Sequence, residues 1–137
     1  MVAREQQAQT ALIEALRGAL EDREDVRLAL LFGSRARGCA RPESDVDVAV
    51  EAPGVDLGTL AADLSEAAGL EVDVADLREA GYPLLKSVLR DGIEVHQGRK
   101  GALGSWRSQA IARVELDRPW FERMRNGFLR KLAAGHG

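Results

Sequence analysis

The stretch LALLFGSRARGCARPESDVDVAVE, residues 28–51, decides the fold that we predict for this chain. Its first part belongs to a short apolar run, 26–32, that ends at Gly33, and such a run is typical of a buried strand. Its last part, 45–51, alternates between polar residues and valine, so the valines share one face and the aspartates the other. Two strands joined by a glycine-serine turn and a loop therefore form the centre of the predicted sheet.

The flanking sequence adds helices and two more strands around this centre. Apolar residues at helical spacing predict helices, and alternation of polar and apolar residues predicts strands. The predicted helices cover 5–20, 56–68 and 83–90, the further strands cover 70–76 and 93–96, and the helical tail that follows is interrupted near Pro119. This order predicts an α/β fold with a small mixed β-sheet flanked by helices and a C-terminal helical tail. We expect one domain over 1–98 and a basic helical tail over 99–137 that packs on the domain or on a partner.

Length, charge and cysteine content narrow the class of protein. The 137 residues suffice for one domain, and the net charge of −3 is unevenly distributed. Residues 28–98 hold six basic and thirteen acidic side chains, whereas 99–137 hold nine basic and three acidic ones. The acidic middle argues against a nucleic-acid groove and suits cations. With one cysteine, no leader at the N-terminus and no apolar run long enough to cross a bilayer, we expect a cytoplasmic protein without membrane contact or direct nucleic-acid binding.

The turn after the first strand has the features of a phosphate site. Gly33 allows the backbone to turn sharply and to approach a ligand closely. If Ser34 opens a short helix, its hydroxyl and the free backbone amides point toward an anion. Arg35, Arg37 and Arg41 follow closely enough to donate charge-assisted hydrogen bonds to phosphate oxygens.

Three aspartates have the features of a metal site. Asp45 and Asp47 lie on one face of a strand, where their charges repel each other unless a cation lies between them. Asp73 joins them if the strand that contains it pairs beside theirs. Three carboxylates suit two Mg²⁺ ions, an arrangement used for in-line attack at phosphorus. A glycine-serine turn or two alternating aspartates alone are common structural features, but together they favour a metal and phosphate site.

These residues also resemble a known family. The stretch LFGSRARGCARPESDVDVAVE (31–51) resembles the signature of the minimal nucleotidyltransferases, a branch of the DNA-polymerase-β-like superfamily. The later VDVADL (72–77) and PLLKSVLRDGIEVHQG (83–98) are similar to the segment of the family's third carboxylate and to its closing helix and strand. The resemblance covers about residues 10–98, and it departs from the family at Cys39, where an acidic residue is usual.

The resemblance implies a polymerase-β-like fold and a role for each site residue. Gly33 and Ser34, with Arg35 and Arg37, would hold the phosphates of ATP. Asp45 and Asp47 would bind Mg²⁺, and Asp73 would bind a second Mg²⁺ and accept the proton of the attacking hydroxyl. AMP would then be transferred to that hydroxyl, and pyrophosphate would leave.

The resemblance also suggests the acceptor. Many similar proteins are antitoxins that add AMP to a tyrosine of a cognate HEPN RNase toxin, and a bare domain of this size suits a protein acceptor. The tail carries Trp106, Trp120, Phe121 and Phe128 among its basic residues, a composition that fits either an interface or packing against the core. Two alternatives stay open: a non-catalytic antitoxin that neutralises its partner by occlusion, and a nucleotidyltransferase for a small hydroxylated molecule such as an aminoglycoside.

Overall fold

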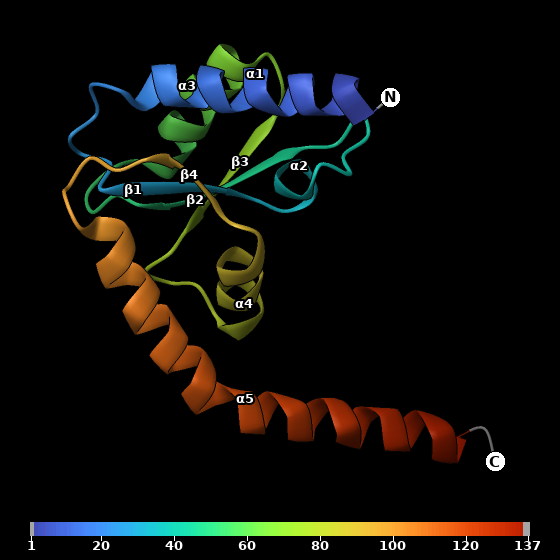
Figure 1. The fold of residues 1–137 in the computed structure, drawn as a ribbon. Coiled ribbons are helices and arrows are strands. Elements are labelled where there is room, and N and C mark those ends of the chain that lie inside the picture. Colours follow the sequence, from blue (N-terminus) through green and yellow to red (C-terminus); the bar gives the residue numbers. More distant parts are fainter. Residues whose placement is uncertain (1, 136–137) are drawn as a thin grey trace.

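A computed structural model describes residues 2–135 as a four-stranded sheet with helices on both faces (Figure 1). The elements are α1 (Val2–Leu20), β1 (Leu28–Phe32), α2 (Ser34–Arg37), β2 (Val46–Glu51), α3 (Leu57–Ala68), β3 (Val72–Asp76), α4 (Tyr82–Asp91), β4 (Ile93–His96) and α5 (Ala102–Gly135). This architecture confirms the predicted mixed sheet with flanking helices and a C-terminal helix. Residues 136–137 of the predicted tail lie outside the described residues.

The sheet has the strand order β3-β2-β1-β4, which places β1 and β2 in its middle and β3 at an edge. β1 pairs antiparallel with both β2 and β4, whereas β2 pairs parallel with β3. A parallel pair needs a crossover connection, and α3 supplies it. In this register, Asp47 of β2 lies opposite Phe32 of β1 on one side and Asp73 of β3 on the other.

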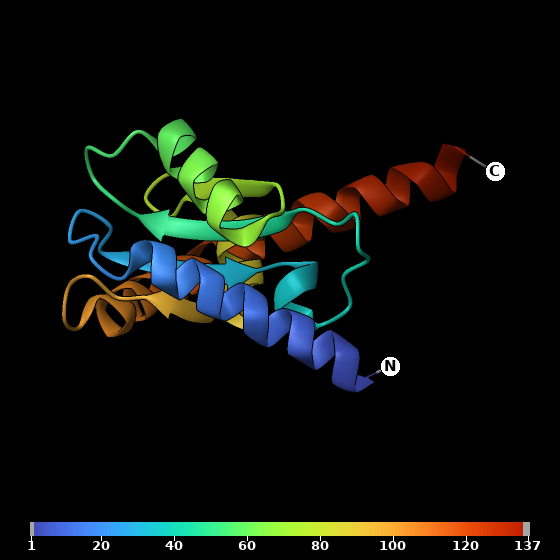
Figure 2. The same cartoon turned by 90° about the horizontal axis from the view of Figure 1, so that it is seen from above.

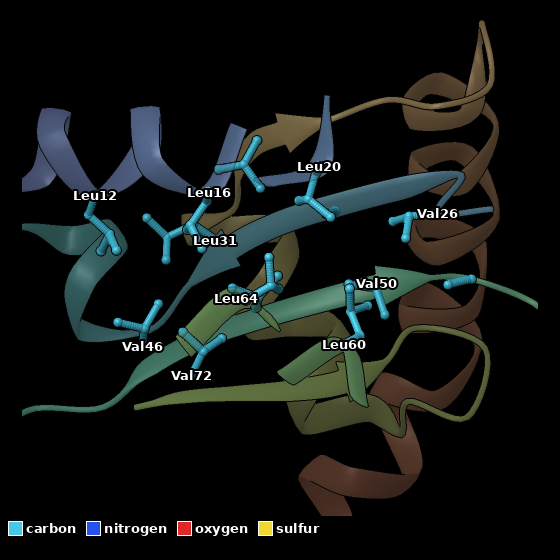
Figure 3. Packing of buried hydrophobic residues seen from close by; sticks show 14 residues of the cluster. Leu12, Leu16, Leu20, Val26, Leu31, Val46, Val50, Leu60, Leu64 and Val72 are labelled. Carbon is cyan, nitrogen blue, oxygen red and sulfur yellow. The ribbon is translucent and has the colours of Figure 1, made fainter. Parts of the chain in front are cut away.

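One face of the sheet packs against α1 and α3. The valines of β2 point to this face, as their alternation predicts, and meet leucines from both helices (Figure 3). The removal of these apolar side chains from water is the main force that holds the two helices on the sheet. α3 begins where Asp56 accepts a hydrogen bond from the Thr59 amide at 3.1 Å, and it ends at Gly69 in the left-handed conformation.

The opposite face packs against α4 and the first part of α5. Leu30 of β1 and Ala49 of β2 belong to this second cluster, together with Leu85 of α4 and Trp106 of α5. Asp47 lies two residues before Ala49 in the same strand and therefore points to this face. The carboxylates and the helices α4 and α5 thus lie on the same side of the sheet.

The long helix α5 differs from the predicted tail. An interruption was expected near Pro119, but α5 runs continuously from Ala102 to Gly135 with Pro119 inside it. Proline removes one helical hydrogen bond and its ring presses on the preceding turn, which kinks a helix without always ending it. The ribbon accordingly changes direction about halfway along α5 and then projects away from the domain (Figure 1; Figure 2). Neither α5 nor any other helix within residues 2–135 is long and apolar enough to span a membrane.

The packing of α3 on the sheet predicts a matched pair of stability changes. Leu64→Ala removes a side chain that is only 1% exposed, so we expect a loss of about 2–5 kcal/mol in the free energy of unfolding. Leu116→Ala makes the same chemical change at a helical position that is 80% exposed, so we expect a change below about 0.5 kcal/mol. Urea titrations followed by circular dichroism measure both, and similar losses in the two variants would contradict this account of the core.

Candidate functional site

The candidate site is built on the turn between β1 and α2. Gly33 has φ 76° and ψ −156°, a conformation that is essentially restricted to glycine. Its carbonyl oxygen accepts hydrogen bonds from the amides of Ala36 and Arg37, both at 3.1 Å, and Ser34 begins the short helix α2 as predicted. Gly38, also at positive φ, ends that helix. The chain therefore reverses sharply at the end of β1 and leaves Gly33 and Ser34 at one end of the sheet.

Asp47 lies directly against this turn. A Cβ atom placed on Gly33 would be 2.5 Å from Oδ2 of Asp47, so the carboxylate occupies the space that any other residue's side chain would need. The pairing of Asp47 with Phe32, the residue before Gly33, accounts for this closeness. The parallel register then sets Asp73 beside Asp47 on the edge strand.

The electrostatics of Asp47 reflect the same grouping. Partial burial raises the pKa of Asp47, and the negative charges of Asp73 and then Asp45 raise it further. The positive charge of Arg37 acts in the opposite direction. The three predicted aspartates and Arg37 thus share one electrostatic environment around the β1–α2 turn.

Arg37 connects the turn to the end of α4. Its Nη1 lies 3.1 Å from Oδ2 of Asp91, the last residue of α4, and Arg90 also binds this carboxylate at 3.0 Å. The hydrogen bond from Arg90, followed by that from Arg37, holds the pKa of Asp91 below its usual range. Sequence reasoning missed Asp91, because 54 residues separate it from Arg37 and no local pattern marks the pair.

Arg35 holds the loop between α2 and β2. Its Nη2 donates hydrogen bonds to the carbonyl oxygens of Ser44 at 2.7 Å and Pro42 at 3.2 Å. From α1, the side-chain amide of Gln9 donates to the carbonyl oxygens of Arg35 and Ala36 at 3.1 and 2.9 Å. Gln9 had no signal in the sequence that linked it to the site. These contacts fix both the short helix and the loop that leads to Asp45.

The carboxylates of the site suit a hard cation, but they do not form a complete set of metal ligands by themselves. Within residues 2–135, no group of three His, Cys, Asp or Glu side chains is arranged to hold a metal ion. Mg²⁺ in proteins is commonly held by one or two carboxylates, waters and the phosphates of a substrate. Asp47 and Asp73 are paired in register and repel each other, so these residues fit a cation that arrives with a phosphate ligand.

Comparison with known families identifies the class of protein. Residues 14–100, more than half of the chain, match the family described as Polymerase beta, Nucleotidyltransferase. The chain therefore belongs to the polymerase β nucleotidyltransferase family. This match confirms the resemblance to the polymerase-β-like superfamily that the sequence motifs indicated. Comparison with curated proteins gives no match.

Solved structures share the fold over nearly the whole chain. A toxin–antitoxin complex with AMP-PNP matches with a TM-score of 0.67 and 24% identity, over 88% of this chain and 98% of that one. The MntA–HepT toxin–antitoxin complex matches with a TM-score of 0.59 and 23% identity, over 93% and 98% of the two chains. A tri-AMPylated Shewanella oneidensis HEPN toxin in complex with MNT antitoxin matches with a TM-score of 0.58 and 22% identity, over 94% and 98%.

The close approach of Asp47 to Gly33 predicts a local steric effect. Gly33→Ala introduces the strain of a non-glycine residue at φ 76° and ψ −156°, about 1–3 kcal/mol, and it forces the Asp47 carboxylate to move away from the new Cβ. Gly33→Ala in an Asp47→Ala background is the control, because it keeps the same backbone strain and removes the carboxylate that the new Cβ would meet, so we expect a smaller loss there. Thermal and urea unfolding measure the loss in both backgrounds, and equal losses would show that the contact with Asp47 has no energetic weight.

The raised pKa of Asp47 predicts a pH-dependent stability difference. Because the folded state binds the Asp47 proton more tightly than the unfolded state, ionisation of this group destabilises the fold as the pH rises through and above about 4. Asp47→Asn should therefore raise Tm at pH 7 in chelator-treated buffer, and the gain should shrink as the pH falls toward about 4 and vanish below it. An Asp47→Asn variant that is less stable at pH 7 would contradict this sign.

A second measurement isolates the effect of the Asp73 charge on the pKa of Asp47. Asp73→Asn removes one of the negative charges that act on Asp47, so it should lower the pKa of Asp47 toward its ordinary value. Carboxyl-detected NMR titration reads this pKa directly in both proteins. An unchanged titration of Asp47 would mean that the two carboxylates do not interact.

Proposed function

We propose that this chain is a Mg²⁺-dependent nucleotidyltransferase that transfers AMP from ATP to a tyrosine hydroxyl of a cognate HEPN RNase toxin, and that it acts as the antitoxin. The observation that carries the proposal is the grouping of Asp47 and Asp73 in adjacent strands with the glycine turn pressed against Asp47. A carboxylate pair beside a phosphate-binding turn is the minimum that transfer of a nucleotidyl group requires.

The turn supplies the binding of the triphosphate. Gly33 lets the phosphates approach the backbone closely, and the amide and hydroxyl groups of Ser34 at the start of α2 donate to phosphate oxygens. Arg37 adds positive charge from an exposed position, and its pair with Asp91 orients it. Arg35 holds the loop over the phosphates through its bonds to Ser44 and Pro42, and its own charge adds to their binding.

The carboxylates supply the metal ligands and the proton acceptor. Asp45 and Asp47 would hold Mg²⁺ and Asp73 would hold a second ion, and the chemistry supplied by such ions is neutralisation of the negative charge on the phosphates. The acceptor oxygen forms a bond to the α-phosphorus, and the bond from that phosphorus to the bridging oxygen breaks. Asp73 lies on the edge strand and is exposed, so it can take the proton of the acceptor hydroxyl.

The acceptor is inferred from the structural neighbours. The similar structures are toxin–antitoxin complexes, and one of them contains a tri-AMPylated HEPN toxin. The exposed aromatic residues of α5 also favour a protein partner, and they leave neutralisation by occlusion as the second candidate function.

Loss of the carboxylates tests catalysis directly. Asp45→Asn with Asp47→Asn should lower transfer of α-³²P-labelled AMP to the cognate toxin by at least about 10³-fold, because two charged ligands of the cation are lost. Glu14→Gln with Glu66→Gln is the matched control, since it removes two exposed charges from α1 and α3 on the opposite face of the sheet. The control should transfer AMP at the wild-type rate.

The same variants separate the two candidate functions. If the Asp45/Asp47 variant still transfers AMP fully, the assigned site is wrong. If it transfers none but still neutralises the toxin in the absence of ATP, occlusion is the mechanism of neutralisation. Transfer of AMP to an aminoglycoside by the wild-type chain, without transfer to the toxin, would instead identify a small-molecule acceptor.

A further inference from the structure

The second half of α5 carries an apolar face that the domain does not cover. Beyond Pro119, the side chains of Trp120, Met124, Phe128 and Leu132 follow one another at intervals of four residues and form what we call the distal stripe. Their exposed fractions are 52%, 57%, 62% and 46%. Residues spaced in this way lie along one face of a helix. Four large apolar side chains in a row are more than the isolated exposed residues normal for a soluble surface.

The distal stripe repeats the pattern of the buried half of the same helix. Ala102, Trp106, Ala110 and Val114 are also four residues apart, and all four are buried in the core. The two sets are offset by eighteen residues, about five full turns of an α-helix, so they have the same helical phase on either side of the bend at Pro119. The helix thus continues a core-facing surface past the point where the core of this chain ends.

Charge indicates what kind of surface covers the stripe. Residues 119–135 carry four basic side chains and one acidic one, a net charge of +3. Where α5 passes α4, a cavity of about 340 Å³ is lined by three basic side chains and one acidic one, with the stacked rings of Tyr82 and Phe121 beside them. The charged residues are Lys86, Arg90, Arg125 and Glu122. Two copies of this basic helix would repel each other, whereas acidic side chains on a different protein would be attracted.

The position of the stripe relates it to the site. α4 and α5 cover the face of the sheet to which Asp47 points, and Arg90 in the basic cavity binds Asp91, which also holds Arg37 of α2. Figures 1 and 2 both show the second half of α5 running toward the end of the molecule where α2 lies. A protein bound along the stripe therefore lies on the same side of the sheet as Asp47, near the end of the molecule where α2 lies.

We propose that the distal stripe, with the basic cavity at its base, is the docking surface for the acceptor protein, which presents an apolar groove edged by acidic side chains. This inference rests on the proposed function for the identity of the acceptor, the cognate HEPN protein. Insertion of the apolar face of one helix into a groove, with anchors one turn apart, is a common mode of recognition. Docking then holds the acceptor hydroxyl near the site.

The test replaces the stripe without touching the site. Met124→Glu with Phe128→Glu should weaken binding of the cognate HEPN protein at least about tenfold, as loss of central apolar anchors does. Asn126→Glu with Ala133→Glu adds the same charge to exposed positions on the opposite side of the helix and should bind like the wild type. Binding is measured by calorimetry, and circular dichroism together with ATP binding in Mg²⁺ verifies that each variant is folded.

A second pair of substitutions tests the role of the basic cavity. Lys86→Ala with Arg125→Ala should weaken binding of the HEPN protein and reduce the dependence of that binding on salt concentration. The wild-type chain alone should sediment as a monomer. Dimers of the wild-type chain that Met124→Glu with Phe128→Glu dissociates would overturn the proposal in favour of a second copy as the occupant.

Three further outcomes would overturn the proposal. They are wild-type affinity in the Met124/Phe128 variant, no binding of the HEPN protein by the wild-type chain, and stripe-dependent binding to phosphatidylglycerol vesicles while the HEPN protein binds both variants equally. The Asp45/Asp47 variant should bind the HEPN protein normally. Stripe-dependent binding without AMP transfer by the wild type would therefore contradict the proposed activity and leave the docking surface intact.

Discussion

The register of β2 against β1 and β3 is the constraint on which the site depends. It sets Asp47 between Phe32 and Asp73, and it does so because the valines of the same strand are buried against α1 and α3. A shift by one residue would turn Asp47 into that core and bring valine to the site. Since burial of each valine side chain contributes roughly 1.5–3 kcal/mol, packing on one face of the sheet determines the polar chemistry on the other.

The same register stores electrostatic repulsion in the folded chain. Asp47 is partly buried and lies near two negative charges, and the positive charge of Arg37 offsets only part of their effect on its pKa. An arrangement of this kind lowers the stability of a fold and is retained where a ligand relieves it. Binding of a cation with a phosphate group would relieve it here, so affinity for substrate and stability of the domain are linked through the same carboxylates.

Much of the fold could be predicted from the sequence, because its elements have strong local patterns. The alternation in 45–51 gave the correct faces of β2, and the glycine at 33 marked the turn. Asp91 and Gln9 were missed because their contacts with α2 join residues far apart in the chain. Pro119 predicted a break where the structure has a bend, since the remaining hydrogen bonds of a long helix tolerate one proline.

The stacking of Phe121 on Tyr82 is the last apolar contact that α5 makes with the core of the domain. Phe121 is the last residue of α5 in the core clusters, and Glu122 and Arg125 still line the cavity beside α4, so the residues from 126 to 135 depend on their own backbone hydrogen bonds. Helical segments of that length are marginal in water. We therefore expect the amide hydrogens of this segment to exchange faster than those of the first half of α5, and proteases to cleave it first. The lifetime of the free chain in a cell would then depend on how soon a bound protein covers the segment.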